Sequence, residues 1–207
     1  MNLIFLQIHG RVNESLKKSV FAVMLGFIEQ LLATLFVMSL IFTYCLRIVD
    51  IQGESMENTL RHEDRVIIGL LYNKPKAGDI VVIKPDEAVT LSDEGVPEFS
   101  EGIRKTIIKR VIACEGQTVD IDFDKGIVYV DGERLKENYV TLGMTHIDEG
   151  AFTGQYPVTV PEGYVFVMGD NRPVSMDSRS DKIGFVSEES ITGRVLIRIS
   201  PKMDFVE

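Results

Sequence analysis

Cysteine and histidine are scarce in this chain, and that scarcity excludes two kinds of site. The 207 residues include two cysteines and three histidines. Cys45 and Cys114 lie far apart with no C-x-x-C pattern, so neither a disulfide scaffold nor a structural zinc site is expected. His9, His62 and His146 show no metal-ligand spacing. The sequence therefore predicts no metal site.

Basic charge is also in short supply. Lys and Arg number 22 against 31 Asp and Glu, a net charge of −9, whereas a nucleic-acid binder needs a basic face for phosphate contacts. No nucleic-acid partner is therefore expected. The apolar content of 45% excludes a disordered chain. Residues 1–47 carry a net charge of +2 and residues 48–207 a net charge of −11, which favours a membrane anchor followed by a water-soluble domain.

One long apolar run lies near the N-terminus, at residues 19–44 (SVFAVMLGFIEQLLATLFVMSLIFTY). As a helix, 26 residues cross about 30 Å of hydrocarbon. The carboxyl of Glu29 costs roughly 2.5–3.5 kcal/mol, but the fourteen Leu, Ile, Phe and Val residues contribute roughly 4–8 kcal/mol in favour of insertion. A cleavable signal peptide would need a small-x-small exit, which the following residues lack. The remaining alternative is a buried amphipathic helix of a soluble protein.

The flanking charges predict the orientation of this span. Arg11, Lys17 and Lys18 precede it, and only Arg47 closely follows it. The positive-inside rule then keeps the N-terminus in the cytoplasm. We expect a plasma-membrane protein with three regions: a cytoplasmic tail (1–18), a single transmembrane helix (19–44) and an extracytoplasmic domain (45–207). Glu29 is interpreted as a contact to a partner helix or a protonated carboxyl, with a functional intramembrane group as the alternative.

The body of the chain is expected to be mainly β. Its apolar runs are short, rich in β-branched residues and separated by Gly, Pro, Asp or Asn, which is typical of an antiparallel fold. The expected strands are 46–51, 65–69, 79–83, 106–113, 118–122, 127–130, 158–160, 164–168 and 194–199. Short helices are expected only at 55–60 and 187–192. Residues 85–102 predict a solvated loop or exposed hairpin, and residues 136–157 a small insertion.

Ser55 is the first candidate for chemistry. It lies in IQGESMENTL, between an expected strand and a helical turn, where a hydroxyl can project while the backbone N–H turns toward a carbonyl oxygen. The alternative is a serine that caps a short helix. A serine nucleophile needs a base, and no histidine has a suitable context. A lysine kept neutral by apolar burial can serve instead.

Lys109 fits that second role. In KTIIKRVIACEG it shares one face of a strand with Ile107 and Val111, so it is expected to point into apolar surroundings. The alternative is a lysine that snorkels to the surface. A third candidate region, residues 163–180, runs from an apolar strand into a polar turn that contains Ser175, Asp177 and Arg179. It could orient a lysine amine, or it could be a structural turn.

Together these segments resemble the bacterial type I signal peptidases, membrane-anchored serine–lysine endopeptidases also called leader peptidases. The resemblance is carried by an N-terminal span followed, in the family order, by GESMENTL, GDIVVIK, IIKRVIACEG and GDNRPVSMDSR. It implies a signal-peptidase- or repressor-protease-like antiparallel β-barrel catalytic domain behind a transmembrane helix. Four places depart from the family pattern. Asn58 replaces a proline, and Gly53 replaces a residue that in some members carries a hydroxyl that helps to bind the oxyanion. Pro173–Val174 precede Ser175 where Asp-Asn is usual, and residues 113–117 (ACEGQ) stand where Leu-Pro-Gly-Asp is common.

The resemblance also implies roles for individual residues. Ser55 would be the nucleophile and Lys109 the general base. Ser175 would hydrogen-bond Lys109, Asp177 and Arg179 would brace the last motif, and Arg110 would be structural. Six residues would line the substrate cleft: Ile51, Gln52, Gly53, Met56, Ile107 and Ile108.

By the same resemblance, the substrates are secretory preproteins, cut after small-x-small sites near the lipid bilayer and close to the export translocon, with no cofactor. Two rival functions remain open. One is a self-cleaving repressor-type peptidase, against which the apolar span argues. The other is a catalytically weak anchored paralogue that binds exported peptides without cleaving them.

Overall fold

The computed structural model describes residues 2–72, 74–92, 94–140, 150–152 and 154–206, with side chains from residue 19 onward. The chain divides into two compact units, Met1–Cys45 and Leu46–Glu207. His146 and the middle of the predicted insertion (136–157) lie at 141–149, outside the described residues.

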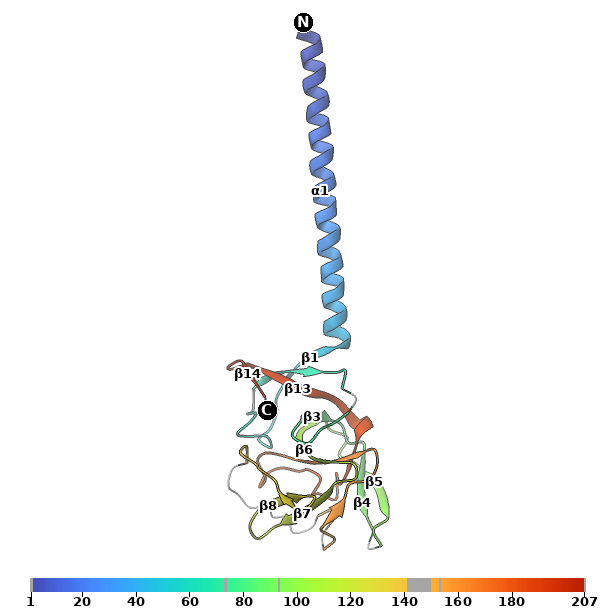
Figure 1. Ribbon diagram of the computed structural model, residues 1–207, viewed down its shortest axis with the longest axis vertical. Helices are drawn as coiled ribbons and strands as arrows, with labels where there is room; N and C mark the ends of the chain where they lie inside the picture. The colour runs from blue at the N-terminus through green and yellow to red at the C-terminus, as the bar shows by residue number, and fades with distance from the viewer. Residues whose placement is uncertain (1, 73, 93, 141–149, 153, 207) are drawn as a thin grey trace. The chain divides into compact units, whose positions relative to one another are not determined.

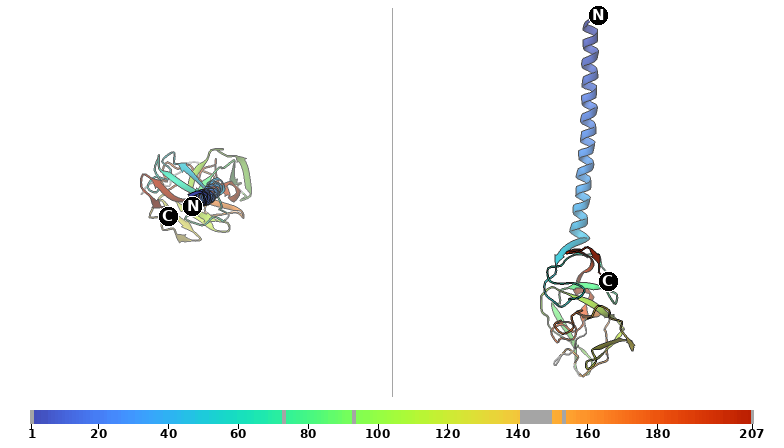
Figure 2. Two further views of the ribbon diagram at one scale, coloured as in Figure 1. Left: turned by 90° about the horizontal axis from the view of Figure 1, so that it is seen from above. Right: turned by 90° about the vertical axis from the view of Figure 1, so that its left-hand side faces the viewer.

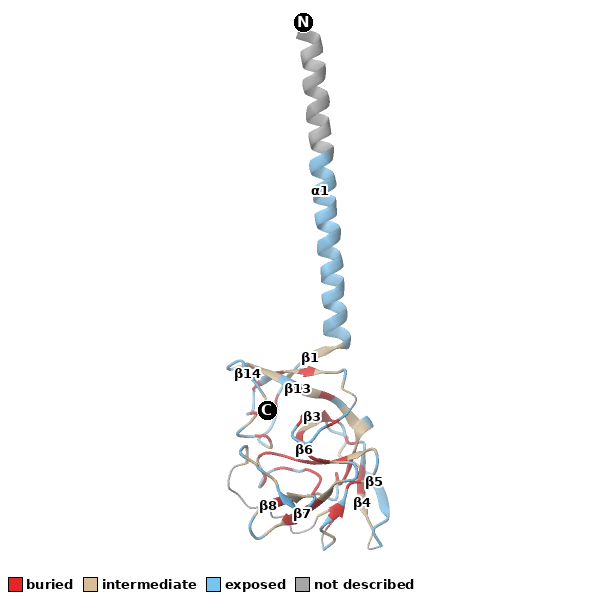
Figure 3. Ribbon diagram, viewed as in Figure 1, coloured by how far each residue is buried: buried red, intermediate tan, exposed pale blue. Residues whose placement is uncertain are grey.

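The first unit is one helix, α1 (Asn2–Tyr44). Its segment Ser19–Tyr44 is long and apolar enough to cross a membrane, and no residue of the most apolar window is buried within the described structure (Figure 3). The hydroxyls of Thr34 and Thr43 donate to backbone carbonyls one turn earlier, so these polar groups are satisfied within the helix. The helix begins at Asn2, well before the predicted span, so residues 2–18 are helical as well. The exposed apolar surface argues against the alternative of a buried helix of a soluble protein.

The second unit consists of short antiparallel strands (Figure 1). The main sheet has the order β1 (Leu46–Asp50), β2 (Arg65–Gly69), β13 (Ile191–Ser200), β3 (Ile80–Ile83), β6 (Ile107–Cys114), β11 (Tyr164–Met168) and β12 (Val186–Ser187), with β14 (Asp204–Phe205) paired to β13. A second sheet has the order β10 (Val158–Thr159), β7 (Thr118–Asp122), β8 (Ile127–Val130) and β9 (Glu133–Arg134), and β4 (Glu87–Leu91) pairs with β5 (Pro97–Glu101). A 3₁₀ turn, η1 (Glu188–Ser190), precedes β13.

The main sheet is curled rather than flat, as Figures 1 and 2 show from three directions. Strand β13 pairs with both β2 and β3, and its register shifts on each side at β-bulges, which bend a strand and increase its twist. Gly193 lies at one of these shifts, and a β-carbon there would lie 2.7 Å from the carbonyl oxygen of Gly69. Glycine therefore permits the close approach of β13 to β2 at this bend.

Three clusters of buried apolar residues fill the unit. The buried positions are red in Figure 3. One cluster lies between the second sheet and the main sheet and contains Phe152, Phe166 and Phe185, whose rings contact one another. Another lies under β1, β2 and β3 and includes Met56 and Leu60. The third joins β3, β6 and β11. Met56 and Leu60, the two buried residues of the GESMENTL segment, thus belong to the core.

The predicted fold class is confirmed: the unit is a mainly β, curled half-barrel of antiparallel strands. The predicted strands are present, with small differences at their ends; the largest is at β13, which begins at Ile191 rather than Arg194. Residues 85–102 form the exposed-hairpin alternative, β4 and β5, although Ala88 and Val89 of β4 are buried. Three two-residue strands, β9, β12 and β14, were not predicted because so short a segment carries no periodic pattern.

The helix predicted at 55–60 is wrong. The segment is a series of hydrogen-bonded turns, with Thr59 N–H and Leu60 N–H both donating to the carbonyl of Met56. Asn58 has φ +90°, a left-handed conformation that a helix cannot contain. The helix predicted at 187–192 is reduced to η1, because β13 pairs from Ile191 onward.

Candidate active site

The turn that carries Ser55 is held from three sides. Before it, Ile51 exchanges backbone hydrogen bonds with Glu63 and Asp64, which extends the pairing of β1 with β2. Inside it, the buried side chains of Met56 and Leu60 anchor it to the core. On the side of the last motif, the backbone N–H of Asn171 donates to the Ser55 carbonyl at 3.0 Å, and its side-chain amide donates to the Glu54 carbonyl at 3.1 Å. The nucleophile candidate is therefore presented on a well-anchored loop.

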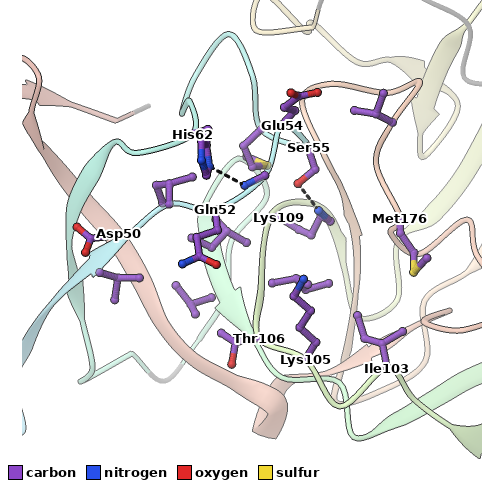
Figure 4. Close-up of a pocket in the computed structure, with 18 residues that line it drawn as sticks. Asp50, Gln52, Glu54, Ser55, His62, Ile103, Lys105, Thr106, Lys109 and Met176 are labelled. Carbon is purple, nitrogen blue, oxygen red and sulfur yellow. Dashed lines mark hydrogen bonds between the residues drawn. The ribbon is translucent and has the colours of Figure 1, made fainter.

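Lys109 reaches this turn from the middle of β6. Its side chain is 2% exposed, and its Nζ lies 2.6 Å from Ser55 Oγ, a hydrogen bond between residues 54 positions apart (Figure 4). Burial lowers the pKa of Lys109 from its ordinary 10.5 to about 8; the Asp177 and Asp170 carboxylates oppose this shift, and Arg179 adds to it. The amine is therefore much more often neutral near neutral pH than an exposed lysine, and can accept a proton from the hydroxyl. The snorkelling alternative does not describe this side chain.

The segment after β11 is a buried ionic turn. Arg179 Nε donates to Asp177 Oδ1 at 2.8 Å, and Asp177 also accepts the Gly169 N–H at 2.9 Å. Burial raises the pKa of Asp177. The charge and hydrogen bonds of Arg179 and the hydrogen bond from the Gly169 N–H lower it by more, so the pKa of Asp177 is below its ordinary value. The Arg179 guanidinium in turn donates to the Arg172 carbonyl at 2.8 Å. The pair therefore holds the turn closed behind Ser55 and Lys109.

Ser175 differs from its predicted position. Its Oγ is buried next to Asp177, whose pKa it helps to lower, and the predicted bond to Lys109 is not formed. Ser175 packs closely against Gly169, next to the Ser55 carbonyl, so it lies beside the Ser55–Lys109 pair without contacting the amine. Its neighbours Val174 and Met176 are exposed and line the cleft, whereas the buried Ser175 between them does not line it.

Arg110 joins β6 to the GDNR segment. Its Nε and Nη2 donate to the two carboxylate oxygens of Asp170 at 2.9 and 2.8 Å, and its Nη1 donates to the Gly78 carbonyl at 2.9 Å. The Thr59 hydroxyl also donates to Asp170 in a very short hydrogen bond. Asp170 thus ties the strand of Lys109 to the turn of Ser55. Asp170, Asn171 and Thr59 were not predicted to have a role, although all three lie in the GDNRPVSMDSR and GESMENTL motifs.

Ser55 and Lys109 lie at a cleft of about 890 Å³ (Figure 4). All six residues predicted to contact substrate line it: Ile51, Gln52, Gly53, Met56, Ile107 and Ile108. Over Ile107–Lys109, β6 pairs with β3 on one edge, whereas β11 begins to pair only at Arg110. One strand edge is therefore open for an extended peptide to pair with it.

The cleft also contains residues that were not predicted. Asp50, Glu54, His62 and Lys105 bring charged or polar groups to its rim, and Val49, Val82, Ile103, Thr106, Val174 and Met176 complete the lining. The Gly53 N–H donates to His62 Nδ1 at 3.3 Å, which fixes the backbone two residues before Ser55. Within the described residues, no three His, Cys, Asp or Glu side chains gather closely enough to hold a metal ion.

Comparisons with known proteins show which proteins this chain is similar to. Residues 24–200 match the family described as signal peptidase, peptidase S26. The chain is 36% identical to a probable signal peptidase I-1 of Synechocystis over 73% of this chain and 69% of that protein. It is 30% identical to signal peptidase I P of Bacillus subtilis subsp. natto over 82% and 85% of the two chains.

A solved signal peptidase I from Enterococcus faecalis is 29% identical, with a TM-score of 0.39 over 58% of this chain and 96% of that one. The family match covers both the end of α1 and most of the β unit, including every residue of the cleft. This chain belongs to the signal peptidase family, peptidase S26.

Proposed function

We propose that this chain removes N-terminal signal peptides from exported preproteins, with Ser55 as the nucleophile and Lys109 as the general base. The observation that carries the proposal is the 2.6 Å contact between Ser55 Oγ and the buried Lys109 Nζ, at a cleft with an open strand edge, in a chain of this family. The preprotein would lie extended in the cleft and pair with Ile107–Lys109. The apolar lining supports small, uncharged side chains before the scissile bond, as in small-x-small sites.

The geometry of Ser55 and Lys109 supports the following proton transfers. Neutral Lys109 takes the proton of Ser55 as Oγ attacks the scissile carbonyl, and the Ser55 N–H donates to the oxyanion that forms. The lysine then passes the proton to the leaving amine, and the signal peptide remains as an ester on Ser55. A water molecule, deprotonated by Lys109, hydrolyses the ester and regenerates the enzyme. Asp177, Arg179, Asp170 and Arg110 hold these groups without joining the chemistry.

The test is cleavage of a preprotein with an Ala-x-Ala site by the full chain in detergent, from pH 6 to pH 10. Ser55→Ala and Lys109→Ala are expected to lose activity, whereas the exposed control substitutions Ser100→Ala and Lys125→Ala keep it. In the wild type, kcat/KM should rise with pH and reach half its maximum near pH 8, because only neutral Lys109 is competent. Activity that survives in either dyad variant would refute the assignment, and a folded but inactive wild type would favour the binding paralogue.

The membrane arrangement is a second part of the proposal. The span Ser19–Tyr44 would anchor the chain in the plasma membrane with its N-terminus in the cytoplasm and residues 46–207 on the outer side, near the translocon and the lipid surface. The basic residues before the span support this orientation. Protease added to intact spheroplasts should digest the β unit, whereas the same protease should spare it if the orientation is reversed.

A further inference from the structure

Residues 137–139 form a small segment, here named the clamp segment, that contacts three parts of the active site from outside the cleft. It follows β9 and lies about 30 positions after Lys109 in the sequence. None of its residues lines the cleft that holds Ser55 and Lys109. The clamp segment lies at the start of the predicted insertion, yet its side chains contact Arg172 and Arg110, two buried residues of the site.

Glu137 fastens the clamp segment to the last motif. Its carboxylate pairs with the Arg172 guanidinium through two hydrogen bonds, one of 3.3 Å and one very short. The two side chains are 10% and 1% exposed, so the pair is shielded from water. Arg172 also donates to the Gly169 carbonyl at 3.0 Å, and its own carbonyl accepts from Arg179. The clamp segment is thereby joined to the ionic turn behind the dyad.

Tyr139 contacts both β6, the strand that carries Lys109, and the turn that carries Ser55. Its ring lies against the Arg110 guanidinium, with 3.9 Å between the guanidinium carbon and the ring centroid, and Arg110 is the residue directly after Lys109. Its carbonyl accepts a hydrogen bond from Asn58 Nδ2 at 3.2 Å, three residues after Ser55. The in-plane donors of Arg110 reach Asp170 and Gly78, so the tyrosine covers the guanidinium face that these bonds leave open. Burial raises the pKa of Tyr139 to about 12, so the ring stays neutral at any assay pH below 10.

We propose that Tyr139 is a positioning residue for the Ser55–Lys109 pair: its ring holds Arg110, its carbonyl holds Asn58, and together they set the distance between β6 and the nucleophile turn. The inference rests on the proposed function for its kinetic consequence. A displacement of about 1 Å between a nucleophile and its base lowers a rate by up to about 100-fold, so a loosened clamp acts on kcat. It leaves KM nearly unchanged, because no clamp residue touches the cleft.

The experiment compares two substitutions of one residue. Tyr139→Phe keeps the ring and the carbonyl and is expected to keep kcat within about twofold. Tyr139→Leu removes the ring and is expected to lower kcat by about tenfold, with KM within about twofold. Val128→Ala in β8, at a fully buried site of the second sheet, is the matched control for lost stability, and its kcat per folded molecule should equal that of the wild type. Rates are measured per folded chain, with the folded fraction taken from circular dichroism.

A milder variant keeps the test decisive if Tyr139→Leu does not fold. Asn58→Gly accommodates the φ of +90° and removes the amide that reaches Tyr139, and it should lower kcat by about threefold to fivefold. The proposal is overturned if folded Tyr139→Leu, or folded Asn58→Gly in its place, retains wild-type kcat, or if its KM rises while kcat is unchanged.

A crystal structure of each variant supplies a readout that needs no substrate. Ser55 Oγ and Lys109 Nζ should separate beyond 3.5 Å in Tyr139→Leu, or in Asn58→Gly if the former does not fold, and stay near 2.6 Å in Tyr139→Phe. If the wild type cleaves no preprotein, the proposed function fails while this distance still decides the role of Tyr139. An unchanged distance in the substituted chain overturns the positioning role even if the wild type is an active signal peptidase.

Discussion

Lys109 should destabilise the fold that contains it, and Lys109→Met should reveal by how much. A pKa of about 8 instead of 10.5 means that protonating this amine is about 3 kcal/mol less favourable in the folded chain than in the unfolded chain. Below pH 8 both states carry the proton, so the folded state bears the whole cost. Between pH 8 and pH 10.5 only the unfolded state binds it, so the cost shrinks as pH rises, and above pH 10.5 it is gone.

Methionine has a similar length and no charge, and it adapts to irregular apolar surroundings. Lys109→Met should therefore be about 3 kcal/mol more stable than the wild type at pH 7, and the gain should fall to within about 1 kcal/mol at pH 10.5. That gain is large beside the roughly 5–15 kcal/mol of a whole domain. The same substitution removes the proposed base and should abolish cleavage.

The assay is urea unfolding of the full chain in detergent at pH 7 and at pH 10.5, followed by circular dichroism of the β-sheet. Lys105→Met, an exposed lysine at the rim of the same cleft, is the matched control and should show no pH-dependent gain. Equal stability of Lys109→Met and wild type at pH 7, or a gain that does not change with pH, would refute the argument that burial depresses this pKa.

Three further predictions follow from other parts of the molecule. Arg179→Met leaves the Asp177 carboxylate buried without its ion-pair partner and should cost about 3–5 kcal/mol of unfolding free energy; a loss below 1 kcal/mol in urea unfolding would contradict the role of this pair. Gly169→Ala adds a β-carbon that would overlap the Ser55 carbonyl, so kcat in the cleavage assay should fall at least about tenfold, and unchanged kcat would show that the turn can shift freely. Leu32→Arg adds about 3 kcal/mol to the cost of inserting α1, so flotation with liposomes should recover less of the chain, and unchanged recovery would argue against α1 as the anchor.

Local patterns were sufficient for most of the fold. The apolar span and the short β-branched runs are signals within a few neighbouring residues, and each corresponds to an element of the structure. The prediction failed where a local preference met a backbone requirement from outside. Residues 55–60 have the composition of a helix start, but Asn58 adopts a positive φ and the buried Met56 and Leu60 hold the segment as turns.

By itself, the sequence determined which residues are candidates for chemistry: Ser55, Lys109 and the segment from Gly169 to Arg179 can be named from motif and spacing. The tertiary structure decided how they meet. Lys109 is buried where β6 meets the turn of Ser55, and its pKa depends on that burial and on the Asp177 and Asp170 carboxylates, 68 and 61 residues away.

The same is true of the supporting contacts. The Asp170–Arg110–Thr59 connection and the approach of Tyr139 to Arg110 join segments that no periodicity relates, and Ser175 lies beside the dyad without the predicted bond to Lys109. Periodicity reports only which face of an element is apolar. The pairing of distant side chains depends on how the curled sheet brings its strands together, and that arrangement exists only in the folded chain.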